Sequence, residues 1–250
     1  MAPALLAVVL AFASDLVDWR GLVALLVVAA ACIAAHRAPG KSARLVAHAV
    51  VVVLCAGFFL HVVPGFNNPR VIDAVLIGEG TSSYSKYLNF DKGMAGVLLL
   101  GLYVPERVRN DEAVHRSTAF AWRFAIMVGA LATVAMASGY ARWDPKLPHW
   151  WALWVWSMLV LTALPEEAVF RGVLQEQIGR YVPGSPWLAI ITAGVLFGLA
   201  HAAGGSLYVL VASLAGVGYV WIYASTRSIA WAITAHAGLN AIHFFIFTYP

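Results

Sequence analysis

The sequence predicts an all-α fold: a polytopic transmembrane helical bundle of about eight spanning helices with a membrane-embedded polar cavity. Hydrophobic residues make up 62% of the 250 residues and charged residues only 11%. Soluble domains contain about 45–50% apolar and about 25% charged residues. The net charge of +4 is not gathered in one basic patch, so the composition indicates the lipid bilayer as partner and no nucleic acid.

Apolar runs separated by short polar stretches define the expected helices. They cover residues 4–17, 21–35, 45–64, 94–104, 118–139, 149–163, 187–203, 207–225 and 229–247. A spanning helix needs about 20 residues, and the runs 4–17 and 94–104 are short, so we expect about eight spans. Nothing between the runs is long enough to fold alone. We therefore expect a single integral membrane domain over 1–250, with membrane helices and an outer loop in 1–148 and catalytic core helices in 149–250.

Lysine and arginine residues indicate the orientation in the membrane. They cluster in the connections 37–44 and 107–116, which are separated by an even number of runs and are therefore predicted to be cytoplasmic. The loop 65–93 then lies outside. The same charge bias places the membrane-embedded polar cavity in the cytoplasmic half of the membrane. We expect a multi-pass protein of a prokaryotic inner membrane.

Two features are expected at the outer side. Turn residues at 67–69 and 78–83 mark a loop that either shapes a substrate entrance or simply connects two helices. Five tryptophans between 143 and 156 predict an aromatic belt at the interface, with a Trp-lined ligand site as the alternative. Cys32 and Cys55 lie in apolar runs and are interpreted as small buried hydrophobic residues.

Two adjacent acidic residues, Glu166 and Glu167, stand within the most hydrophobic half of the chain. A carboxylate in the middle of a membrane helix costs about 3 kcal/mol, so it is expected to be paired, to face a wet cavity or to do chemistry. Glu167 and Arg171 are four residues apart and can form an ion pair, although a surface pair at a helix end is the alternative. Glu166 points about 100° away and lacks that partner. Glu176 and Arg180 repeat the spacing nearer a loop and are interpreted as solvated.

Histidines mark two further segments. His201 ends an apolar run, and Phe197 lies on its helical face. His236 and Asn240 share one face of the last run. Each pattern alone also suits a structural role, either a histidine at a helix C-terminus or a hydrogen bond between packed helices. His243 either extends the polar face or points to the interface, and we interpret His48 and His61 as packing residues.

Together the three segments predict hydrolytic chemistry. A carboxylate beside a neutral imidazole can hold and deprotonate water, and burial makes the carboxylate a better base. Amide and imidazole groups can donate hydrogen bonds to an oxyanion. The chain contains neither the G-x-S-x-G motif of serine hydrolases nor the H-E-x-x-H motif of zinc proteases.

The motifs Glu166-Glu167-x-x-x-Arg171, Phe197-x-x-x-His201 and His236-x-x-x-Asn240 occur in this order on successive apolar segments. This pattern resembles the CPBP family of CAAX proteases and bacteriocin-processing proteins, which includes the type II CAAX prenyl endopeptidase. The resemblance covers about residues 160–243, and the preceding half matches only as membrane helices. It implies a glutamate-type intramembrane protease.

The resemblance also implies residue roles. Glu166 would be the base that activates water, and His201 would help to hold that water. His236 and Asn240 would line the oxyanion hole. Supporting roles would fall to Glu167, Arg171 and Phe197. We expect no metal cofactor, because asparagine and arginine are poor zinc ligands, although glutamate and histidine leave zinc as the alternative.

The expected substrates are peptide bonds in membrane-anchored or lipidated proteins or peptides, namely C-terminal CAAX-like tails, leader peptides or sorting signals. Two other functions remain open. Some members of the family act in bacteriocin self-immunity or as scaffolds without proteolysis. A transporter or proton relay also uses buried Glu and His, but the sequence has no inverted repeat.

Overall fold

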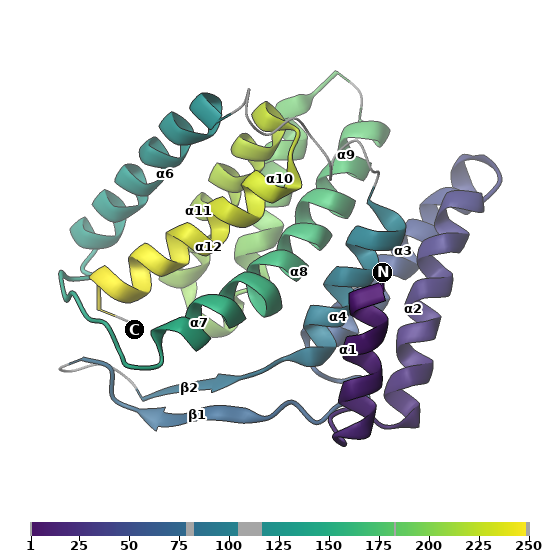
Figure 1. The fold of residues 1–250 in the computed structure, drawn as a ribbon. Coiled ribbons are helices and arrows are strands. Elements are labelled where there is room, and N and C mark those ends of the chain that lie inside the picture. The colour runs from purple at the N-terminus through teal and green to yellow at the C-terminus, as the bar shows by residue number, and fades with distance from the viewer. Residues whose placement is uncertain (1, 79–82, 105–116, 183, 249–250) are drawn as a thin grey trace.

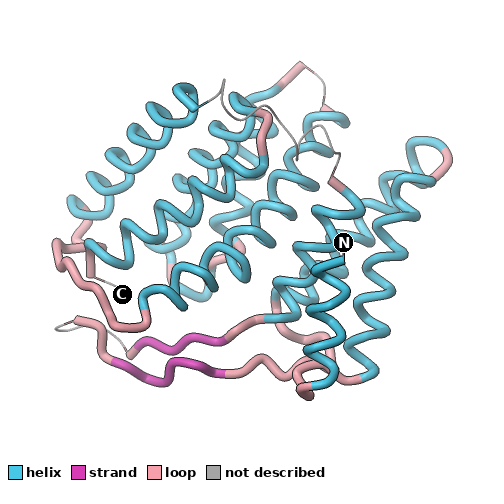
Figure 2. The backbone as a smooth tube through the Cα atoms, in the orientation of Figure 1, coloured by secondary structure: helices cyan, strands magenta, loops and turns pink. Residues whose placement is uncertain are grey.

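The computed structural model describes residues 2–78, 83–104, 117–182 and 184–248, which fold as a helical bundle with one short β-hairpin beneath it (Figures 1 and 2). One group of helices consists of α1 (Ala2–Ala13), α2 (Trp19–Arg37) and α3 (Gly40–Phe59), packed beside α4 (Phe90–Leu98) and its continuation η1 (Leu99–Tyr103). The other contains α6 (Ser117–Ala137), the long helix α7–α9 over residues 151–181, α10 (Pro186–Leu199), η5 (Ala202–Gly204), α11 (Ser206–Thr226) and α12 (Ile229–Ile246).

The prediction of an all-α polytopic bundle is confirmed, but fewer helices are long enough to span than the sequence suggested. Within the described residues, six helices have the length and apolarity needed to cross a membrane, instead of about eight. The apolar helices α1 and α10 are shorter, with 12 and 14 residues. The apolar run 94–104 forms only the end of α4 and η1, which are packed inside the bundle.

The outer surface of the bundle is apolar. Large aliphatic side chains such as Leu5, Leu26 and Val53 are 65–69% exposed, and α6 buries only Met127 and Leu131 within the described protein. Contiguous apolar surface of this extent is unfavourable in water and suits contact with lipid. The exposed aliphatic residues therefore support the membrane assignment independently of helix length.

The glutamate pair lies in the interior of the 31-residue helix α7–α9. This helix runs through α7 (Trp151–Met158), η3 (Leu159–Ala163), α8 (Leu164–Glu167), η4 (Ala168–Gln175) and α9 (Glu176–Tyr181). The segments η3 and η4 are π-helical, and such wider turns occur often at functional sites. Pro165 follows the first of them and lacks the N–H that a regular α-helix would require at that point.

A two-stranded antiparallel hairpin, which the sequence did not predict, occupies the outer loop. It pairs β1 (Arg70–Val75) with β2 (Tyr84–Tyr87). The ring of Tyr84 stacks on Trp150 at 5.6 Å and also packs on Phe244 at 5.4 Å. These contacts hold the hairpin beneath α7 and α12 (Figure 1). Part of the predicted turn at 78–83 lies outside the described residues.

The tryptophans from 143 to 156 divide into two groups. Trp143, Trp151 and Trp156 are about half exposed or more, as the predicted belt requires. Trp154 is 1% exposed and stacks on Phe244 at 4.3 Å, so it belongs to the support of the hairpin.

Helices α10 and α11 approach each other closely through glycine. A methyl group at Gly194 would lie 2.8 Å from the backbone nitrogen of Val217, and one at Gly216 would lie 2.7 Å from the carbonyl of Gly194. Small residues allow such close backbone packing in membranes. This packing holds the segment that ends in His201 against α11.

Two polar residues, Glu176 and His61, differ from their sequence interpretation. Glu176 is buried rather than solvated, and it pairs with Arg227 at 2.8 Å instead of Arg180. His61 contacts the buried carboxylate of Asp91 at 2.7 Å, so it is more than a packing residue. Their actual partners come from distant segments, which an i,i+4 pattern cannot reveal. Cys32 and Cys55 are buried free thiols, as expected.

Candidate active site

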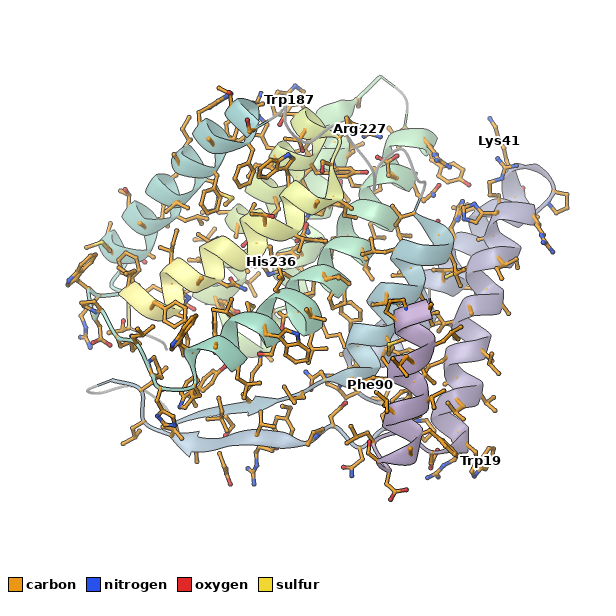
Figure 3. The ribbon with its side chains drawn as sticks, viewed as in Figure 1. Trp19, Lys41, Phe90, Trp187, Arg227 and His236 are labelled. Atoms are coloured by element: carbon orange, nitrogen blue, oxygen red, sulfur yellow. The ribbon has the colours of Figure 1, made fainter. Side chains whose placement is uncertain are left out.

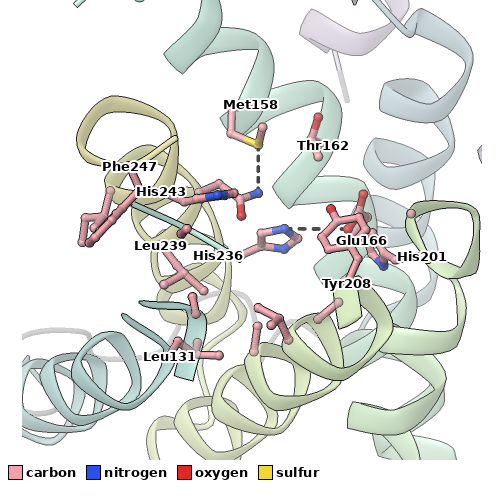
Figure 4. Close-up of a pocket in the computed structure, with 18 of the residues that line it drawn as sticks. Leu131, Met158, Thr162, Glu166, His201, Tyr208, His236, Leu239, His243 and Phe247 are labelled. Carbon is pink, nitrogen blue, oxygen red and sulfur yellow. Dashed lines mark hydrogen bonds and ion pairs between the residues drawn. The ribbon is translucent and has the colours of Figure 1, made fainter. Parts of the chain in front are cut away.

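Glu166 lies in the wall of a cavity of about 600 Å³ inside the larger group of helices. The cavity is lined by α6, the α7–α8 part of the long helix, α10, α11, α12 and the hairpin strand β2. Glu166, His201, His236 and Asn240 all border it. Figure 4 shows the first three directed toward a common space. The structure thus brings together the four residues that the sequence proposed as catalytic.

A lysine that the sequence analysis did not select contacts the central carboxylate. Lys92 Nζ lies 2.6 Å from Glu166 Oε1, and its ammonium group also lies 4.9 Å from the ring centre of Phe59. The side chains of Lys92 and Glu166 are 13% and 7% exposed. Glu166 therefore has a cationic partner, although Arg171 is not that partner. The sequence signal for this contact is that Lys92 lies just before the apolar run 94–104. The sequence analysis places Lys92 in the outer loop 65–93.

Glycines in α4 allow Lys92 to reach Glu166. A methyl group at Gly93 would lie 2.6 Å from Leu161, and one at Gly96 would lie 2.5 Å from Pro165 Cα. Only glycine permits the backbones to approach so closely. Helix α4 consequently lies directly against the helix turn before Glu166.

The second glutamate is held on both sides, by an imidazole and by a guanidinium. Glu167 Oε1 lies 2.8 Å from His236 Nδ1, and its Oε2 lies 3.0 Å from Arg171 Nε. Arg171 also donates to the carbonyl of Gly216 at 2.8 Å. Glu167 and Arg171 are fully buried. The predicted i,i+4 pair is formed, in the protein interior rather than at a surface.

This pairing determines which nitrogen of His236 faces the cavity. A carboxylate can only accept when ionised, so the Nδ1–H of His236 donates to Glu167. Nε2 then faces Glu166 Oε2 at 3.7 Å, beyond direct hydrogen-bonding distance. Glu166 Oε2 is buried and has no hydrogen-bond partner among the described residues. A separation of this kind suits a small polar molecule beside both atoms.

His201 has a similarly defined orientation. Its Nδ1 lies 2.8 Å from the carbonyl oxygen of Phe197, which can only accept, so Nδ1 carries a proton. In the neutral ring, Nε2 is then an acceptor. The Phe197 ring packs on His201 at 4.8 Å and on His236 at 5.5 Å. Phe197 therefore contacts both imidazoles and restricts their positions.

Asn240 contributes an amide that is only weakly engaged. Its Nδ2 lies 3.2 Å from Met158 Sδ, and a thioether is a weak acceptor. A stronger acceptor in the cavity can therefore replace this contact. His243, one turn beyond Asn240, also lines the cavity. It therefore extends the polar face instead of pointing to the membrane interface.

The hairpin supplies a second lysine to the cavity. Lys86 lines it and is partly buried. Burial and the nearby ammonium of Lys92 lower the pKa of Lys86 to about 8, although the carboxylate of Glu166 opposes this change. The side-chain ammonium of Lys86 forms no hydrogen bond or ion pair with any described residue.

The hairpin lies at the end of the bundle opposite the basic connection that contains Lys41. Figure 3 labels Lys41 and Arg227 at one end and Trp19 at the other, near which the hairpin lies. The cavity is bordered by hairpin residues 84–87, so it extends toward the end predicted to be outside. The orientation of the bundle in the membrane, and with it the cytoplasmic position of the site, stays a prediction.

The donor set does not resemble a metal site. In the part of the chain that the structure describes, no three His, Cys, Asp or Glu side chains are arranged to hold a metal ion. Glu166 and Glu167 instead contact Lys92, His236 and Arg171.

These features define an all-α, multi-pass membrane protein with a buried polar site of two glutamates, two histidines and an asparagine. Residues 148–242 match the family model described as type II CAAX prenyl endopeptidase Rce1-like. This segment is therefore similar to that family, in agreement with the resemblance that the sequence motifs indicated. No curated protein and no solved structure matches the chain.

Proposed function

We propose that this protein is an intramembrane endopeptidase that cleaves a membrane-associated protein with water activated by Glu166. The observation that supports this most directly is the buried Oε2 of Glu166, which has no hydrogen-bond partner among the described residues and lies 3.7 Å from His236 Nε2 at the wall of the cavity. Water bound there can lose a proton to Glu166 as it attacks a peptide carbonyl. The match of residues 148–242 to a protease family agrees with this chemistry.

The other residues support the same reaction. His201 Nε2 accepts a hydrogen bond from the attacking water, because its Nδ1 is committed to Phe197. Asn240 donates to the oxyanion in place of its weak contact with Met158. His236 can join it as a donor only as an imidazolium, because Nδ1–H is committed to Glu167. Lys92 holds the carboxylate of Glu166 in its ionised, basic form by direct contact.

A comparison of protein termini in the membrane proteome tests the proposed activity. Cells of the source organism that produce the wild-type protein are compared with cells that produce Glu166→Gln. Uncut proteins that accumulate in the variant would support proteolysis and identify the substrate. Identical termini, with equal expression, would contradict the proposal and favour the immunity or scaffold function.

Metal chelation separates the proposed mechanism from zinc catalysis. We expect EDTA and phenanthroline to leave turnover unchanged, because each carboxylate of the glutamate pair already contacts a protein side chain, Glu166 with Lys92 and Glu167 with His236. The measurement is peptide cleavage by the purified protein before and after dialysis against each chelator. Activity that is lost and then restored by zinc would contradict the metal-free mechanism.

Within this function, we propose that Lys86 binds the C-terminal carboxylate of the substrate, which favours a C-terminal tail over an internal segment. Lys86 lines the cavity and has no anionic partner among the described residues. Its charge is present below a pKa of about 8 and is lost above it. A peptide with a free C-terminus should therefore bind about tenfold better than its amide at pH 7, since a hydrogen bond to a charged group contributes about 1.5 kcal/mol.

The ratio of KM values for the acid and amide peptides measures this preference. The preference should decline as pH rises from 7 to 9, should persist at pH 9 in Lys86→Arg, and should be absent in Lys86→Met. Both peptides are cleaved by the same catalytic residues, so the ratio of their KM values is insensitive to titration of Glu166 or the histidines. Equal KM values at pH 7 would contradict this role of Lys86.

A further inference from the structure

A second, smaller cavity lies at the end of the bundle that carries Lys41. Its volume is about 220 Å³, and it is enclosed by α2, α3, η1 and the η4–α9 part of the long helix. Arg44 and Arg180 border it, in the region where Figure 3 labels Lys41. None of the residues proposed for catalysis lines it. The active site therefore does not explain its polar residues.

A chain of hydrogen bonds connects Gln177 and Tyr103 to a buried histidine there. Gln177 Nε2 donates to Tyr103 Oη at 3.0 Å. Tyr103 Oη lies 2.5 Å from His48 Nδ1. An amide nitrogen can only donate, so the single phenolic proton is free to be donated to His48 Nδ1. In this arrangement His48 carries its ring proton on Nε2.

The Nε2–H of His48 needs an acceptor. His48 is 7% exposed, and its Nε2 has no hydrogen-bond partner within the described chain. A buried donor without a partner costs about 1–3 kcal/mol. Because His48 lines the cavity, a ligand in the cavity is positioned to supply the missing acceptor. This orphan donor is a sign of ligand binding that is independent of the charge around it.

The charge around the cavity is suited to an anion. Arg44 and Arg180 are exposed and form no ion pair with any described residue. One carboxylate, Glu176, also borders the cavity, but it is engaged by Arg227 at 2.8 Å and by the hydroxyl of Tyr223 at 3.0 Å. With this carboxylate engaged, the guanidinium groups of Arg44 and Arg180 have no carboxylate partner among the described residues.

We propose that this cavity binds a phosphate group through Arg44, Arg180 and the Nε2–H of His48. Guanidinium groups bind phosphate oxygens with paired, charge-assisted hydrogen bonds, and the histidine supplies a further donor. Basic pockets between membrane helices on the cytoplasmic side commonly bind lipid headgroups. The same chemistry suits the phosphate of an anionic lipid and free inorganic phosphate.

Titration calorimetry with two probes tests the site and distinguishes a lipid headgroup from free phosphate as its ligand. The delipidated full-length protein in dodecyl maltoside is titrated with inorganic phosphate and with dihexanoyl phosphatidylglycerol. We expect saturable binding of at least one probe, weakened at least tenfold by Arg44→Gln and by Arg180→Gln. Binding of the lipid alone identifies a headgroup site, and binding of phosphate alone identifies a site for the free ion.

Lys41→Gln is the matched control, because Lys41 is exposed at the same end but does not line the cavity. It should bind the probe as the wild type does. Thermal unfolding of each variant establishes that it is folded before titration. The proposal is overturned if neither probe binds, or if both arginine variants bind as tightly as the wild type.

Discussion

Replacing Glu166 with glutamine is expected to lower peptide turnover by about 100- to 10,000-fold, the range that general-base catalysis contributes. Glutamine keeps the shape of the side chain but cannot take a proton from water. Lys92 loses its ionic partner, yet its ammonium group still lies against Phe59, so the fold should persist. The measurement is cleavage of a peptide substrate by the purified variant, after size-exclusion chromatography has established its fold.

Asp73→Asn provides the charge-matched control. Asp73 is an exposed carboxylate of β1 that pairs with Arg70 at 2.9 Å and does not line the cavity. Its replacement removes the same charge and should leave turnover within about twofold of the wild type, because exposed pairs contribute little energy. Full turnover by Glu166→Gln would remove the proposed mechanism, whatever the control shows.

Local spacing in the sequence is sufficient to predict part of the site. Glu167 and Arg171 are one turn apart, so helix geometry alone brings them together, and the structure forms this pair. Lys92 could not be found in the same way. It is 74 positions from Glu166, and it reaches the site only because Gly93 and Gly96 allow α4 to pack closely against the long helix.

The number of spanning helices shows a limit of composition. An apolar run indicates burial in lipid or in protein, but it does not give the length of the helix. The run 187–203 ends early as a helix because α10 stops at Leu199 and a short 3-10 turn follows. The hairpin was missed for a related reason: its strands have only six and four residues and bury little more than Ile72 and Tyr84.

Replacing Arg171 with methionine is expected to destabilise the protein by about 3–5 kcal/mol, the cost of breaking a buried ion pair by removing one partner. Arg171 and Glu167 are both fully buried, and the variant leaves the carboxylate of Glu167 with only His236. The free energy of unfolding in mixed SDS micelles measures the effect. Arg70→Met, which breaks an exposed pair, should cost less than about 1 kcal/mol.

The double variant Glu167→Gln with Arg171→Met separates charge from packing. If the cost of Arg171→Met comes from an uncompensated buried carboxylate, removing that carboxylate should restore much of the stability. Glutamine still offers an oxygen to the Nδ1–H of His236, so the imidazole should keep its orientation toward Glu166. A double variant as unstable as Arg171→Met would show that the guanidinium stabilises the fold through Gly216 and the rings of Phe197 and Tyr219 instead.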